Sequence, residues 1–381
     1  MQPRDLSSHA PYVPGRGTEE VARELGMDPA DLTKLSSNEN PHGPSPRAVE
    51  AIEAAAGRIN VYPKASHTDL TDALADHWDV APEQVWLSAG ADGALDYLSR
   101  AFLEPGDRVL APEPGFSYYG MSARYHHGTV ATYSLSRADD FAQTAEGILD
   151  AYDGERIVYL TTPHNPTGSE LPADELDELA DRVDDHTLLV VDEAYGEYSE
   201  SPSAIGRLAD RDDLAVTRTF SKAYGLAGLR IGYAVVPEAW ADAYARVNTP
   251  FAASELACRA ALAALEDQGH VESCVETARW ARRYYRDELD VPTWESGGNF
   301  VLADVGDASA VAEACQRRGV IVRDCSSFGL PACVRVSAGT RAGTKEAVGV
   351  LNDVVDDLDV EAESSGRAEA DAGEADEVDA A

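Results

Sequence analysis

The chain has 381 residues, of which 68 are acidic and 31 basic, so its formal net charge is −37. This length allows a large core and favours two domains in close contact. The charge repels phosphate backbones and anionic lipids, so neither nucleic acid nor a membrane is an expected partner. Because the acidic residues are spread along the whole chain and lysines are few, we interpret the excess as a solvated surface suited to a salt-rich cytoplasm.

Cysteines and apolar runs limit the class of protein further. The 5 cysteines contain no C-x-x-C pair and have no histidines at metal-ligand spacing, and their odd number argues against a disulfide framework. We expect them to be reduced and mostly buried. The N-terminus lacks a signal-like apolar segment, and no run reaches the roughly 20 apolar residues that cross a bilayer. We therefore expect a cytoplasmic protein without a metal site.

Four regions follow one another along the chain. Residues 1–40 form an N-terminal arm that completes a small domain, and 41–270 form a large domain. There, strand-like runs alternate with amphipathic helical ones, which predicts an α/β fold with a mostly parallel, doubly wound sheet. Residues 271–358 start with a long helical stretch and continue as a smaller α+β domain. Residues 359–381 have almost no apolar content, so we expect an acidic, disordered tail. The strand-like runs of the large domain are 108–111, 156–162, 187–192 and 215–220.

Polar residues stand at the ends of three of these runs, where parallel sheets bind ligands. Asn165 follows the second run, Asp192 ends the third, and Ser221 and Lys222 lie just beyond the fourth. Together with Arg230 they match the needs of pyridoxal 5'-phosphate. Lys222 supplies the amine for a Schiff base and for proton transfer. Asp192 supplies the carboxylate for the ring nitrogen, although alone it would equally fit a helix N-cap.

Further residues fit the same cofactor more weakly. Ser221 and Arg230 are donors for its phosphate, and Asn165 and Tyr195 can bond its phenolic oxygen. The backbone of Ala91 and Asp92, at the expected start of a helix, is a natural phosphate seat. Phe116 can lie over the ring. Taken singly, Tyr195 and Phe116 are equally consistent with core packing.

These motifs resemble those of fold-type I enzymes of the aspartate-aminotransferase superfamily, and within it the histidinol-phosphate aminotransferases. The resemblance covers nearly the whole chain outside the acidic tail. It implies Lys222 as the Schiff-base lysine and the residues above as cofactor contacts. It also implies that Tyr62 reaches the cofactor phosphate of a neighbouring subunit, and hence a homodimer with shared active sites. The chain departs from the family at Gly93, Phe116 and His164, where Glu, Tyr and Asn are common; we expect His164 to serve loop packing rather than catalysis.

The substrate expected from this resemblance is histidinol phosphate, with 2-oxoglutarate as amino acceptor and glutamate as product. Arg335 occupies the place of the arginine that binds a carboxylate in related enzymes. Arg323 lies on a neighbouring apolar segment, and two guanidinium groups suit a dianionic phosphate. The family places Tyr12 and Asn38 nearby. Each arginine could instead form a surface ion pair with local acids.

Other activities stay open at this point. A threonine-phosphate decarboxylase has the same fold and also takes a phosphorylated substrate. A broad aromatic aminotransferase is a further alternative, because a pocket for imidazole can accept other flat rings. A ligand-sensing regulator of transcription would need a DNA-binding domain and a basic face, which this acidic chain does not offer.

Overall fold

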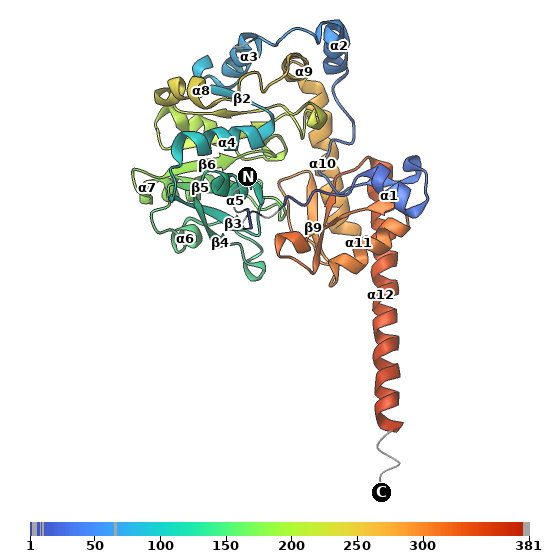
Figure 1. Cartoon of the computed structure of the whole chain (residues 1–381). Coiled ribbons are helices and arrows are strands. Elements are labelled where there is room, and N and C mark those ends of the chain that lie inside the picture. Colours follow the sequence, from blue (N-terminus) through green and yellow to red (C-terminus); the bar gives the residue numbers. More distant parts are fainter. Residues whose placement is uncertain (2–5, 8, 10, 65–66, 376–381) are drawn as a thin grey trace.

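The computed structural model describes residues 1, 6, 7, 9, 11–64 and 67–375, and the surroundings of side chains as far as residue 358. Its large domain contains a seven-stranded sheet in the order β2-β8-β7-β6-β5-β3-β4 (Figure 1). Neighbouring strands from β3 to β7 are parallel, whereas β8 is antiparallel to β2 and β7. The mostly parallel α/β sheet is therefore confirmed. The strands are β2 (Val85–Ser88), β3 (Arg108–Glu113), β4 (Thr129–Ser134), β5 (Ile157–Thr161), β6 (Leu188–Asp192), β7 (Leu214–Thr219) and β8 (Gly232–Val235).

Both faces of this sheet are covered, which explains why its central strands are apolar without a break. In β6, Leu188 and Val190 belong to one apolar cluster, and Leu189 and Val191 belong to a second. Successive side chains of a strand point to opposite faces, so each cluster fills one side of the sheet. Helices α4 and α5 pack on the first side, and α6 and α7 pack on the second. The helices of this domain are α2 (Pro46–Ala55), α3 (Thr68–Trp78), α4 (Gly90–Phe102), α5 (Tyr118–Tyr125), α6 (Ala145–Leu149), α7 (Ala173–Arg182), α8 (Ala241–Val247) and α9 (Glu255–Leu265).

A smaller set of strands lies beside the large domain (Figure 1). Strand β12 (Cys333–Ser337) pairs antiparallel with both β9 (Phe300–Asp304) and β11 (Arg323–Asp324). The N-terminal β1 (Thr33–Lys34) pairs in parallel with β10 (Val320–Ile321). Residues 320–324 are thus divided between two sheets. Around these strands lie α1 (Thr18–Leu25), α10 (Gln268–Glu288) and α11 (Ala308–Arg317).

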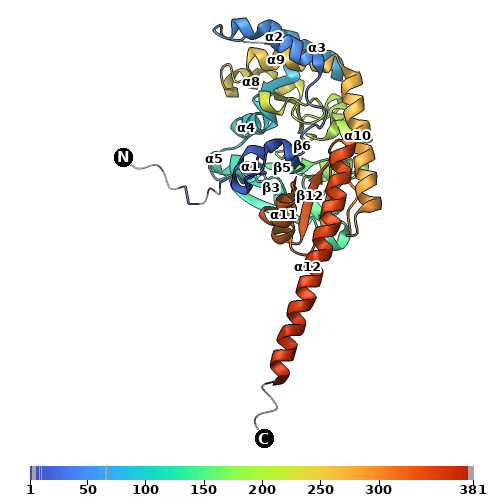
Figure 2. The same ribbon diagram turned by 90° about the vertical axis from the view of Figure 1, so that its right-hand side faces the viewer.

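The last helix, α12 (Arg341–Ala375), starts on the small domain and then projects away from the body (Figure 2). Most of the segment that we expected to be disordered thus belongs to helix α12 in the structure. Alanine and glutamate are good helix formers, which is compatible with a helix that has no apolar face to bury. The order of this segment and the four domain boundaries stay predictions.

Three other expectations concern the described residues as a whole. All five cysteines are free and buried, as predicted. Within the described ranges, no helix is long and apolar enough to cross a membrane. Nor does this part of the chain contain a group of three or more His, Cys, Asp or Glu residues that could hold a metal ion.

Candidate active site

A cavity of about 530 Å³ opens at the carboxyl ends of β5, β6 and β7. Its wall contains Asn165, Asp192 and Lys222, which follow or end these three strands. Segments of the small domain and of the N-terminal arm close the other side. Of the predicted site residues only Tyr62 lies outside the cavity, and those that line it are Tyr12, Asn38, Ala91, Asp92, Phe116, Asn165, Asp192, Tyr195, Ser221, Lys222, Arg230, Arg323 and Arg335.

Lys222 presents its amine to the cavity beside the ring of Tyr195. Its Nζ lies 5.4 Å from the centroid of the Tyr195 ring. Within the described part of the chain it makes neither a hydrogen bond nor an ion pair. The side chain is half-buried in the cavity wall. The ammonium group is therefore available to a ligand.

Asp192 is buried without a cationic partner among the described residues, with 4% of its surface exposed. Its Oδ2 accepts a hydrogen bond of 2.7 Å from the Tyr119 hydroxyl, and its Oδ1 accepts one of 3.0 Å from the Ala194 N–H. Burial raises the pKa of this carboxyl to about 6. The next helical turn starts only at Gly196, with Tyr195 at its N-cap, so the N-cap alternative for Asp192 is wrong.

Tyr119 is a site residue that the sequence did not reveal. It is fully buried, and its hydroxyl also lies 2.8 Å from that of Thr161 at the end of β5. These contacts hold the Asp192 carboxylate in one orientation. Tyr119 lies three residues after Phe116, and this spacing at a helix start was the available signal.

The start of α4, together with Ser221 and Arg230, offers donors suited to an anion, and we call this place the anion cup. Gly90 has φ of +79°, and a Cβ atom there would lie 2.3 Å from an Nη atom of Arg230. Only glycine therefore lets the Arg230 guanidinium approach this helix start. Arg230 donates to Ser221 Oγ over 3.4 Å and to Asp92 Oδ2 over 3.2 Å. Its own φ of +53° is unusual for a non-glycine residue, as is found at binding sites.

The groups predicted for the cofactor's phenolic oxygen are joined to the substrate side of the cavity. The Asn165 amide oxygen accepts a hydrogen bond from Arg335. The Tyr195 hydroxyl accepts one of 2.9 Å from the Asn38 amide. Large-domain and small-domain residues thus meet at this point, because Arg335 lies on β12.

Arg323 and Arg335 face each other across a strand pair, since β11 and β12 place them directly opposite one another. Within the described residues neither arginine has a carboxylate partner, so the surface ion-pair alternative is not what the structure shows. Arg335 is buried, which lowers its pKa, and it donates to the Ser36 carbonyl oxygen over 2.9 Å. Arg323 donates to the carbonyl oxygens of Val13 and Pro14. Two like charges at paired positions repel each other, and an anion between them removes that repulsion.

Tyr62 and His164 complete the set of predictions. Tyr62 is 80% exposed and packs against Phe251, with ring centroids 5.0 Å apart. Its predicted role concerns a second subunit and stays a prediction. His164 is fully buried beside the cavity, with its Nδ1 2.7 Å from the Thr167 hydroxyl, and burial lowers its pKa to about 3. It packs within the loop, as expected.

The buried carboxylate of Asp192, the amine of Lys222 and the anion cup are together the set of groups that pyridoxal 5'-phosphate requires, and this set on a doubly wound sheet defines a pyridoxal-phosphate-dependent transferase. The model of the aminotransferase class I and II family matches residues 30–351. The chain belongs to this family.

Individual relatives narrow the comparison. The histidinol-phosphate aminotransferase of Haloferax volcanii is 74% identical over 94% of this chain and 99% of the relative. That of Halorubrum lacusprofundi is 70% identical over 94% and 98%. Among solved structures, the histidinol-phosphate aminotransferase of Sinorhizobium meliloti in complex with pyridoxal 5'-phosphate has a TM-score of 0.85 and 30% identity, covering 93% of this chain and 98% of that one.

Proposed function

We propose that this chain is a pyridoxal-phosphate-dependent transaminase that exchanges the amino group between histidinol phosphate and 2-oxoglutarate, giving imidazole acetol phosphate and glutamate in histidine biosynthesis. The names of the relatives support this reaction. The observation that supports histidinol phosphate as the substrate is the opposed pair Arg323 and Arg335. Neither arginine has a carboxylate partner among the described residues. Two guanidinium groups recognise a dianionic phosphate better than a single carboxylate.

In this reaction the cofactor, when bound, supplies an aldehyde for the amine and a ring that withdraws electrons. Lys222 holds the cofactor through its amine and moves the proton at the amine-bearing carbon of the substrate. Asp192 keeps the ring nitrogen protonated, since a cation there stabilises an otherwise costly buried carboxylate. The Tyr119 hydroxyl fixes the position of that carboxylate. The start of α4, with Ser221 and Arg230, binds the cofactor phosphate.

The substrate end is built from the small domain and the arm. Arg335 is rigidly placed by the Ser36 carbonyl and by Asn165, so it orients the substrate phosphate relative to the cofactor. Arg323 joins that phosphate and at the same time holds the arm at Val13 and Pro14. Tyr12, whose ring meets Phe116 edge-on at 6.1 Å, covers the cavity and helps to exclude water.

The decisive experiment incubates the purified protein, saturated with cofactor, with histidinol phosphate and 2-oxoglutarate and measures glutamate. We expect glutamate to accumulate one-for-one with imidazole acetol phosphate. Phenylalanine in place of histidinol phosphate tests for an aromatic aminotransferase, and release of CO₂ from threonine phosphate tests for a decarboxylase. Faster turnover of either of these alternatives would contradict the proposal.

We also propose a cytoplasmic homodimer whose two active sites are shared. Its support is a group of exposed apolar side chains: Tyr62 packs against Phe251, and Ile59 and Val61 shortly precede Tyr62 in the chain, with exposed fractions between 48% and 80%. Exposed apolar clusters of this kind mark interaction surfaces. Sedimentation equilibrium at the working salt concentration tests the dimer, and a monomer would rule out shared sites.

A further inference from the structure

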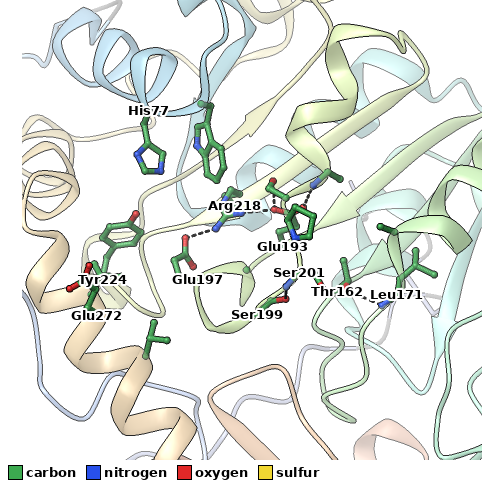
Figure 3. A pocket seen from close by; sticks show the side chains of 18 of the residues that line it. His77, Thr162, Leu171, Glu193, Glu197, Ser199, Ser201, Arg218, Tyr224 and Glu272 are labelled. Carbon is green, nitrogen blue, oxygen red and sulfur yellow. Dashed lines mark hydrogen bonds and ion pairs between the residues drawn. The ribbon is translucent and has the colours of Figure 1, made fainter.

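A second cleft is lined by residues that include Glu193, Arg218 and Glu272 (Figure 3). Its volume is about 530 Å³, as large as that of the active-site cavity. Glu193, which directly follows β6, and Arg218 on β7 line it, and the end of α3 contributes His77 and Trp78. Helix α10 forms the opposite wall. None of these residues belongs to the active site described above.

A buried charge cluster forms the floor of this cleft. Arg218 lies between Glu193 and Glu197, donating to both, with a distance of 2.7 Å to Glu197 Oε1 (Figure 3). The Arg218 guanidinium also stacks 4.6 Å from the centroid of the Trp78 ring. The side chains of Arg218 and Glu197 are 5% and 10% exposed. One guanidinium thus faces two carboxylates in a poorly hydrated place.

The hydrogen bonding of this cluster is incomplete at Glu197 and also at Arg218, whose Nε has no partner within the described part of the chain. Both oxygens of Glu193 are used, by Arg218, by the Ser203 hydroxyl and by the Ala204 N–H. Glu197 Oε2, in contrast, has no hydrogen-bond partner within the described part of the chain. A buried acceptor of this kind costs free energy unless a donor reaches it. The cluster therefore leaves one oxygen of Glu197 open to a further donor, and its two carboxylates face a single guanidinium, so an added cation balances its charge.

The wall opposite the floor carries further negative charge and apolar surface. Glu272 and Glu276 lie one turn apart on α10, are exposed, and form no ion pair among the described residues. The arginines Arg207 and Arg279, which also line the cleft, are already paired with Asp177 and Glu200. The apolar part of the lining is Leu171, Leu176, Val271 and Val275.

We propose that this cleft binds a small organic cation, with N–H donors at one end and an apolar or aromatic body at the other. The cationic end meets Glu197, Glu272 and Glu276, and the body lies against the Leu and Val side chains. A metal ion does not fit, because the described residues contain no group of side chains able to hold one. Since Glu193 directly follows Asp192, the occupant lies close to the active-site carboxylate but in a separate cleft.

Benzamidine and benzamide test this site, because the two have nearly the same shape and only benzamidine is a cation. Calorimetric titration uses the cofactor-loaded enzyme at its working salt concentration. We expect benzamidine to bind with a Kd of about 1 mM or lower, and at least about tenfold more tightly than benzamide. Val275→Trp, which fills the cleft, should weaken benzamidine binding at least about tenfold. Glu272→Gln combined with Glu276→Gln should weaken it about threefold to tenfold.

Glu288→Gln is the matched control, because Glu288 lies on the same helix but outside the cleft. Its benzamidine affinity should equal that of the wild type. Equal affinities for benzamidine and benzamide would overturn the proposal, and so would the absence of any binding heat. Binding that survives Val275→Trp would also overturn it, since the cation would then bind elsewhere. The measurement needs no turnover, so its result is independent of the proposed reaction.

Discussion

Asp192 and Glu193 are neighbours in the sequence and equally buried, with 4% of each exposed, yet they lie on opposite faces of the sheet in opposite surroundings. Glu193 is paired with the Arg218 guanidinium. Asp192 meets a phenol and a backbone N–H, and within the described residues no cation. A paired carboxylate is complete within the protein, whereas burial without a cation raises the pKa of Asp192 to about 6. Partners rather than residue type therefore separate a structural carboxylate from one that awaits a cationic ligand.

The largest effect on the active-site face should come from Lys222→Ala. The variant removes the amine that we propose to hold the cofactor and to move the proton, so kcat should fall at least about ten-thousand-fold. Glutamate formation from histidinol phosphate measures this. Lys345→Ala, on the exposed start of α12, is the control and should keep wild-type activity. Wild-type turnover by the Lys222 variant would remove this residue from the mechanism.

The two neighbouring carboxylates should respond in opposite ways to loss of charge. Asp192→Asn should lower kcat/KM by roughly a hundredfold to a thousandfold, because a neutral amide no longer stabilises the protonated ring nitrogen. Glu193→Gln should change kcat/KM by less than about fivefold but destabilise the fold by about 2 kcal/mol, because Arg218 loses part of its counter-charge. Steady-state kinetics and denaturant unfolding separate these effects. Equal kinetic losses would remove the contrast between the two faces.

Removal of the cofactor should expose the raised pKa of Asp192 as a pH-dependent stability. Because the pKa of Asp192 is higher in the folded than in the unfolded state, its protonated carboxyl contributes to the free energy of unfolding. This contribution is fully present below about pH 4 and is lost as the pH rises through about 6. Relative to Asp192→Asn, the cofactor-free wild type should lose about 3 kcal/mol across this window. Thermal unfolding of both proteins measures this. With the cofactor bound, the difference should disappear, since the ring cation then pairs with the carboxylate.

Arg335 and Arg323, which we propose to bind the substrate phosphate, should differ in their contribution to kcat/KM although they lie opposite each other. Arg335 is buried and loses its interaction with the phosphate completely on truncation, so Arg335→Ala should cost roughly 2–3 kcal/mol, or one to two powers of ten in kcat/KM. Arg323 is more exposed and already donates to Val13 and Pro14, so Arg323→Ala should cost about tenfold. Phenylalanine as amino donor is the control substrate, because it lacks the phosphate. Losses of kcat/KM of equal size for phenylalanine would show that these arginines do not recognise the phosphate.

Local patterns predicted the parts of the molecule that depend on local sequence. The apolar runs of β5, β6 and β7 and the motif residues at their ends follow from period and order along the chain. Contacts between segments that are distant in the sequence produce no such local pattern, so they could not be predicted. Arg323 meets Pro14 across 309 positions, and Tyr119 meets Asp192 across 73. Nor did the sequence indicate the cleft behind Glu193, since its residues come from helices and strands that only the fold brings together.

In the proposed homodimer Tyr62 reaches the active site of the second subunit, and Tyr62→Phe should have the smallest effect. The ring keeps its packing on Phe251, so the fold should be unchanged and only the hydroxyl is lost. Loss of one hydrogen bond to the partner's cofactor phosphate corresponds to about 1 kcal/mol, or about a fivefold weaker cofactor affinity. Tyr125→Phe, at another exposed tyrosine, is the control and should bind the cofactor as the wild type does.

Mixed dimers of Tyr62→Phe and Lys222→Ala subunits decide whether the site is shared. If Tyr62 acts in the partner's site, one of the two sites in each mixed dimer combines an intact Lys222 with an intact Tyr62. That site should turn over with wild-type cofactor affinity. If Tyr62 acts within its own subunit, every site with an intact Lys222 carries the phenylalanine, and the affinity stays weakened. Titration of activity against added cofactor distinguishes the two arrangements, because the Lys222→Ala sites contribute no turnover in either case.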